Sequence, residues 1–139
     1  MEELPHASEE FIKAAKEEKW YTSYHDMLNE ILNKIAPDTQ VLAEKFEHYT
    51  FTKEEFENAT LFDIKKCNYR FNPMEKLNCH NNSVRLCIYN PFYNVYTGYV
   101  LHKDGIWTFH SWVVDRNNLL IETSEMGLLY YGIKMDKIF

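Results

Sequence analysis

Three residues in the second half of the chain carry side chains suited to nucleophilic catalysis. Cys79 stands in LNCHNNSVRLCIYN, His110 in WTFHSWVVD and Glu122 in LLIETSE. A thiol attacks a carbonyl carbon, an imidazole takes up and returns a proton, and a carboxylate orients the imidazole. The order predicts a triad in which Cys79 is the nucleophile, His110 its base and Glu122 the orienting acid.

The strand pattern places two members of this triad side by side. Residues 95–102, 106–115 and 119–124 read as strands, with turns between them at 103–105 and 116–118, which predicts a three-stranded antiparallel meander. If the second turn pairs Asp115 with Leu119, then Trp112 lies opposite Glu122, and Glu122 is a diagonal neighbour of His110. Asp115 is the alternative hydrogen-bond acceptor for the His110 ring, although its side chain is expected on the opposite face of the strand from His110. Trp112 is expected to wall the site and exclude water.

The nucleophile is expected at the start of a short helix. Val84, Cys87 and Ile88 follow Cys79 at helical spacing, and Pro91 closes the segment. The positive end of the helix favours thiolate over thiol, and pairing with the histidine lowers the thiol pKa further. The backbone N–H of the nucleophile is one expected oxyanion donor, and a side-chain amide is the second. The sequence does not choose among three amides: Asn78, Asn72 and Asn68.

The remaining cysteines and histidines are not expected to take part in the triad. Cys67 and Cys87 are expected in the core. A zinc site made of Cys67, Cys79, His80 and Cys87 matches in residue type, but there is no C-x-x-C pair and the spacing matches no common site. We therefore predict no metal and no cofactor. His80 is a rival base that we expect at the surface, and His102 is expected to be solvated.

The first half of the chain reads as helical scaffold. Helices are expected from Ser8 through 20, over 23–35, more weakly over 39–49, and over 51–66, where Thr52 and Glu55 have capping-box spacing. With the nucleophile helix and the meander, this predicts an α+β fold: N-terminal helices and a nucleophile-bearing helix on an antiparallel sheet of three to five strands. We predict one domain over 1–139, with scaffold at 1–66 and a catalytic core at 67–139.

Charge and composition narrow the function classes. Residues 1–66 carry a net charge of −7 and residues 67–139 a net charge of +1. Without a basic patch interleaved with aromatics, nucleic acid is not an expected partner. The start MEELPHASEE is unlike a signal peptide and no long apolar run follows, so no membrane association and a cytoplasmic location are expected. Three cysteines without an export signal predict reduced thiols.

The motifs resemble a known superfamily. CHNNS, TGYV, HSWV and LIET, in this order, are similar to the core of the papain-like transglutaminase superfamily, particularly to its compact microbial and phage-type members. The resemblance covers residues 77–123, and YYGI after it resembles a tail of some such proteins. It implies a papain-like core with Cys79, His110 and Glu122 as the triad. Two departures are that glutamate replaces the more usual aspartate and that no glutamine marks the expected oxyanion position.

The predicted activity is cysteine-dependent acyl transfer. The enzyme is expected to be a hydrolase, namely a peptidase, amidase or deamidase, acting on a protein, peptide or other amide substrate through a Cys79 thioester. Transamidation uses the same intermediate. The alternative is a non-catalytic binding or inhibitory protein on the same fold. The sequence specifies neither the substrate nor the oligomeric state.

Overall fold

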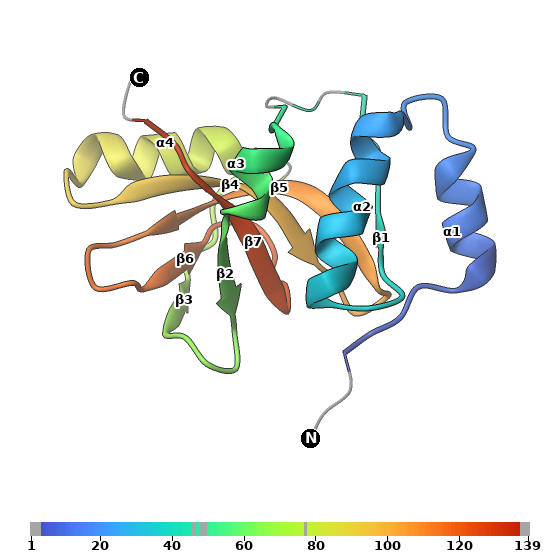
Figure 1. The fold of residues 1–139 in the computed structure, drawn as a ribbon. Helices are drawn as coiled ribbons and strands as arrows, with labels where there is room; N and C mark the ends of the chain where they lie inside the picture. Colours follow the sequence, from blue (N-terminus) through green and yellow to red (C-terminus); the bar gives the residue numbers. More distant parts are fainter. Residues whose placement is uncertain (1–3, 46, 48–49, 77, 137–139) are drawn as a thin grey trace.

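The computed structural model describes residues 4–45, 47, 50–76 and 78–136, and shows an α+β fold with a curled sheet (Figure 1). The helices are α1 (Glu9–Lys16), α2 (Ser23–Ile35), α3 (Lys53–Glu57) and α4 (Cys79–Tyr89). The strands are β1 (Gln40–Val41), β2 (Thr60–Asp63), β3 (Tyr69–Phe71), β4 (Asn94–Leu101), β5 (Ile106–Val114), β6 (Leu120–Glu122) and β7 (Leu129–Lys134). No helix in the described ranges is long and apolar enough to span a membrane.

The sheet is larger than the sequence predicts. Seven strands join it, in the order β2-β7-β4-β5-β6-β3, with β1 paired to β5. The prediction of three to five antiparallel strands is therefore wrong in number, and also in direction, because β1 pairs with β5 and β3 with β6 in parallel. Three of the added strands, β1, β2 and β3, have two to four residues each, too few for a periodic pattern to mark them, whereas β7 has six residues.

The predicted meander is confirmed with its register. Strands β4, β5 and β6 are antiparallel neighbours, and Val113 pairs with Ile121 and Val114 with Leu120. Asp115 N–H donates to Leu119 O in the turn, where Asn118 takes a positive φ of 62°. This register places Trp112 opposite Glu122, as the turn assignment requires.

Two of the predicted helices are confirmed at their starts. Ser8 caps α1 by accepting from Phe11 N–H, and α2 covers the whole of the predicted 23–35. The predicted capping box is present at α3, where Thr52 and Glu55 bond reciprocally. That helix ends at Glu57, however, and the chain turns into β2, so the prediction of a helix to residue 66 is wrong.

Residues 39–45 are not helical either. The N–H groups of Gln40 and Leu42 donate to the carbonyls of Gly105 and Trp107, and Asn29 Oδ1 accepts from Val41 N–H. These long-range bonds outweigh a weak helical propensity. Phe46, His48 and Tyr49, which fall in the same predicted helix, lie outside the described residues.

The two faces of the sheet are packed differently. One face is covered by α2 and α3 around Leu28, Leu32 and Phe56, and by α4 through Cys87. The other face curls upon itself around Trp112 and a cluster of buried side chains from β2, β4, β5, β6 and β7. Cys87 is thus a core residue, as predicted, and Cys67 is half-buried against the second cluster.

Candidate active site

Helix α4 begins at the predicted nucleophile. Cys79 is its first residue and Asn78 its N-cap, and the Asn78 side chain forms no capping bond. Apolar contacts of Val84 and Cys87 with Val95 and Val113 hold the helix against the sheet. The first backbone N–H groups of a helix lack intrahelical acceptors, so Cys79 lies at a partly positive end.

Strand β5 has a gap along one edge, and the thiol occupies it. On that edge β1 pairs with Ile106 and Trp107, and β6 pairs with Val113 and Val114. Residues 108–112 pair with β4 along the opposite edge, but on this edge no strand among the described residues pairs with them. The backbone of Ser111 hydrogen-bonds to the thiol of Cys79 here, which helps to lower the thiol pKa. A break in strand pairing thus gives the sulfur a backbone donor.

His110 bridges the thiol and a buried carboxylate. Its Nε2 donates to Oε1 and Oε2 of Glu122 at 2.7 and 2.9 Å, and its ring also hydrogen-bonds to Cys79. Since Nε2 faces the carboxylate, Nδ1 is the nitrogen that serves the thiol. The ring of Trp112 stacks behind His110, with centroids 6.3 Å apart and planes 18° apart. Trp112 is completely buried, so it backs the histidine and does not line the cavity, which corrects the predicted wall.

Glu122 is completely buried and accepts hydrogen bonds on both oxygens. Oε1 accepts from Tyr130 O–H at 2.7 Å, and Oε2 accepts from the N–H groups of Thr123 and Ser124 at 2.9 and 3.0 Å. Burial alone would raise the pKa of Glu122, but the bond and charge of His110 and the Tyr130 hydroxyl outweigh burial and lower it. The carboxylate therefore stays ionised beside the imidazole.

The electrostatics favour a charged sulfur and a charged ring. Burial opposes both charges, yet the hydrogen bond and mutual attraction lower the pKa of Cys79 and raise that of His110. Glu122 adds to the rise for His110. The direction of both pKa shifts favours the thiolate and imidazolium pair over the neutral thiol and ring.

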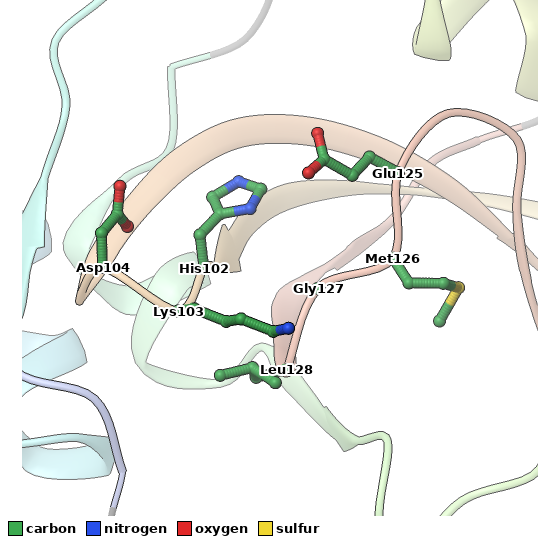
Figure 2. A pocket seen from close by; sticks show the side chains of 7 residues that line it. All are labelled: His102, Lys103, Asp104, Glu125, Met126, Gly127 and Leu128. Carbon is green, nitrogen blue, oxygen red and sulfur yellow. The ribbon is translucent and has the colours of Figure 1, made fainter.

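Cys79 and His110 open on a cavity of about 730 Å³, whereas Glu122 lies buried behind them. Twelve residues line it: Glu44, Asn78, Cys79, His80, Asn81, His102, Thr108, Phe109, His110, Ser111, Ser124 and Glu125. A second cavity of about 530 Å³ adjoins it, because His102 and Glu125 belong to both linings (Figure 2). Figure 2 shows Lys103 and Asp104 following His102 along the turn, and Met126, Gly127 and Leu128 following Glu125.

The acidic first half contributes a residue to this cavity. Glu44 lies in the loop after β1, and burial together with the charge of Glu47 raises its pKa, while His110 acts in the opposite direction. Glu47 accepts from His25 Nε2 at 3.0 Å and anchors the loop to α2. The segment predicted as scaffold therefore forms part of the cavity wall.

The structure separates the three predicted oxyanion amides. Asn78 lines the cavity, but its Nδ2 donates to Glu75 Oε2 at 3.4 Å and its Oδ1 accepts from Asn81. Asn68 and Asn72 lie at the two ends of β3, bonded through their backbones to Leu120 and Glu122. Neither lines the cavity, so the structure does not support either as an oxyanion donor.

Sequence reasoning missed or misplaced three residues near the triad. Tyr130 belongs to the YYGI segment, which by itself showed no link to Glu122. His80 was expected at the surface, but it is half-buried, lines the cavity and bonds through Nδ1 to Ser111 Oγ at 3.1 Å. His102, expected to be solvated, is half-buried and bonds through Nε2 to Thr108 Oγ1 at 2.8 Å. The position of His80 directly after Cys79 in the sequence is the signal that could have indicated its place beside the nucleophile.

Cys79, His80, His102 and His110 line one cavity, but they are not arranged as metal ligands. Within the described residues, no group of three or more His, Cys, Asp or Glu side chains is placed to hold a metal ion.

Comparison of the chain with protein families, curated proteins and solved structures finds no match in any of the three. The chemistry of the site is therefore argued from its geometry.

Proposed function

We propose that the protein is a cysteine-dependent acyl-transfer enzyme, in which Cys79 is the nucleophile, His110 the acid and base, and Glu122 the orienting carboxylate. One observation carries the proposal: His110 hydrogen-bonds both to the thiol at the start of α4 and to a fully buried carboxylate, beside an open cavity. A structural cysteine has no need of a charged partner held in this way.

The first half-reaction forms a thioester. The Cys79 thiolate attacks the carbonyl carbon of an amide, and the carbonyl electrons move to oxygen to give an oxyanion. When this intermediate collapses, the C–N bond breaks and the His110 imidazolium gives its proton to the departing nitrogen. The amine leaves, and the acyl group stays on the sulfur.

The second half-reaction returns the thiolate. Neutral His110 takes a proton from water as the water oxygen attacks the thioester carbonyl. Collapse of the second intermediate breaks the C–S bond and releases a carboxylic acid, leaving thiolate and imidazolium in their starting states. Water is always available, so hydrolysis is the proposed outcome, and an amine in place of water would give transamidation.

The order of elements supports the resemblance to the papain-like transglutaminase superfamily. Helix α4 carries the cysteine at its start, and the following antiparallel strands carry the histidine on β5 and the acid on β6. We include a papain-like core in the proposal on this ground, with a peptide or protein amide as the substrate.

The test compares the reactivity of the three cysteines. Iodoacetamide labelling of each is followed by peptide mass spectrometry across pH, in the wild type and in His110→Ala. Cys79 should react rapidly below about pH 7, and should lose that advantage in the variant. Buried Cys87 and half-buried Cys67 are internal controls.

A second measurement separates an enzyme from an inert thiol. p-Nitrophenyl acetate should release a burst of p-nitrophenolate, leaving one acetyl group on Cys79. If Cys79 labels no faster than Cys67, the proposal fails and the binding-protein alternative is favoured. Rapid labelling without acetyl transfer would leave a reactive thiol without acyl-transfer activity, and would also refute the proposed function.

A further inference from the structure

The proposed acyl transfer lacks an assigned side-chain donor for the oxyanion. The backbone N–H of Cys79 is one donor, and a second usually comes from a neighbouring polar group. Asn68 and Asn72 do not line the cavity, and Asn78 is bonded to Glu75 and Asn81 at the rim. A different residue has to meet the negative charge that develops on the substrate.

His80 has the position for this task. It follows the nucleophile directly in the first turn of α4, and its side chain lines the same cavity as Cys79 and His110. Its ring is held at Nδ1 by Ser111 Oγ at 3.1 Å, while the backbone of Ser111 bonds to the Cys79 thiol. One residue of β5 therefore fixes the nucleophile through its backbone and the His80 ring through its side chain.

A hydrogen-bond chain runs behind the His80 ring. Ser111 Oγ lies 2.9 Å from Thr97 Oγ1, and both side chains are buried. Either hydroxyl can donate in this pair, and Nδ1 of His80 can donate to Ser111 Oγ or accept from it. The role inferred below requires that Thr97 donate to Ser111 and that Ser111 donate to Nδ1, which places a ring proton on Nε2.

We infer that His80 is a catalytic residue that donates Nε2–H to the oxyanion formed on Cys79, together with the backbone N–H of Cys79. The role rests on the proposed acyl transfer and adds a residue that neither the triad nor the resemblance assigns. The chain Thr97, Ser111, His80 holds the donor in place before substrate arrives, which is the condition under which such donors are effective.

Two reactions of the Cys79 sulfur distinguish a residue that stabilises the oxyanion from one that stabilises the thiolate. Alkylation by iodoacetamide requires the thiolate but creates no oxyanion on a carbonyl group, whereas acetylation by p-nitrophenyl acetate requires both. In His80→Ala, the alkylation rate of Cys79 should stay within about twofold of the wild type. The acetylation rate should fall about 100-fold or more, as on removal of one oxyanion donor.

The variant His80→Gln keeps an N–H donor that does not titrate, and should recover much of the acetylation rate with an unchanged pH profile. His6→Ala, which removes an exposed histidine, is the matched control. Circular dichroism and the urea midpoint verify folding, and His80→Met, which keeps a long side chain without an N–H donor, replaces the alanine variant if that variant is unfolded.

Each result decides between the two proposals. Equal loss of alkylation and acetylation in His80→Ala would show that His80 acts on the thiolate, and would overturn the inference. Unchanged acetylation in that variant would also overturn it, while leaving the proposed function intact. If the wild type itself shows no acetyl burst, the proposed function and the inference fail together.

Discussion

At the scale of single residues, the length of Glu122 matters as much as its charge. Its carboxylate accepts hydrogen bonds from His110 on β5, from Tyr130 on β7 and from two backbone N–H groups that follow β6. An aspartate would be one methylene shorter, so its carboxylate would lie farther from the diagonal neighbour His110 at the same strand position. The longer side chain of glutamate thus suits the diagonal register found between β5 and β6.

Tyr130 is the residue whose removal tests this buried network most directly. Tyr130→Phe keeps the ring against Trp112 but removes the hydroxyl that donates to Glu122 and accepts from Gly127 N–H. We expect a loss of about 1–3 kcal/mol in the free energy of unfolding, because a buried N–H is left unsatisfied and the carboxylate loses a donor.

Urea denaturation at neutral pH measures this loss. Tyr89→Phe is the matched control, since Tyr89 is 83% exposed and its hydroxyl can bond to water. Iodoacetamide labelling of Cys79 should also slow in Tyr130→Phe. Without the Tyr130 hydrogen bond, the Glu122 carboxylate is held less firmly beside His110 and stabilises the imidazolium less. A variant as stable and as reactive as the wild type would show that the Tyr130 hydroxyl does not hold the site.

At the scale of elements, helix α4 acts on the nucleophile through its end. Cys79 lies where the helix is partly positive, and Asn78 at the N-cap is neutral. Asn78→Asp places a negative charge beside the thiolate at almost unchanged size. We expect the midpoint of the pH profile for Cys79 alkylation to rise by about one pH unit, because a like charge disfavours the thiolate.

The control for Asn78→Asp is the same substitution, Asn90→Asp, at the other end of α4. Asn90 is the C-cap, and the eleven-residue helix separates it from Cys79 by about 16 Å, which is beyond the screening length of about 10 Å at moderate salt. Asn90→Asp should leave the alkylation profile where it is. If both variants move the profile equally, the effect comes from net charge and not from the helix end.

The elements that could be predicted from the sequence are those with local signals. Helix α2 has a clear apolar face, and the meander has alternating strands with turns at Gly105 and Asn118, both of which take positive φ. These turns set the register, which is why the contact between His110 and Glu122 could be derived. Strands β1 and β3 are too short for such signals and exist through long-range parallel pairing. The contacts of Tyr130 and His80 depend on the curl of the sheet and on helix placement, neither of which has a local pattern.

At the scale of the whole molecule, the curl of the sheet closes the site. Strands β4 and β5 lie between β7 and β6 in the sheet order, yet Tyr130 of β7 contacts Glu122 of β6 (Figure 1). Gly132 allows this closure, because a Cβ there would lie 2.6 Å from the Trp112 ring. The core that stabilises the fold therefore includes the groups that are proposed to do the chemistry.

This coupling predicts a defined pH dependence of stability. The pKa of Glu122 is lowered in the folded state, so its contribution is present above its unfolded pKa of about 4.3 and is lost as pH falls through the folded value. The pKa of His110 is raised, so its contribution is full below about 6.5 and is lost as pH rises through the folded value. Both contributions are complete only between these two limits.

Glu122→Gln removes this charge pairing while keeping the size of the side chain. The wild type should exceed the variant in free energy of unfolding by about 3 kcal/mol near pH 5.5, since removing one partner of a buried ion pair leaves the other unpaired. The difference should shrink towards lower and higher pH. Urea denaturation across pH measures it, with Glu57→Gln, from the exposed pair with Lys53, as a control that changes little. A difference that is the same at every pH would mean that Glu122 stabilises the fold by packing alone, and that the imidazolium does not depend on it.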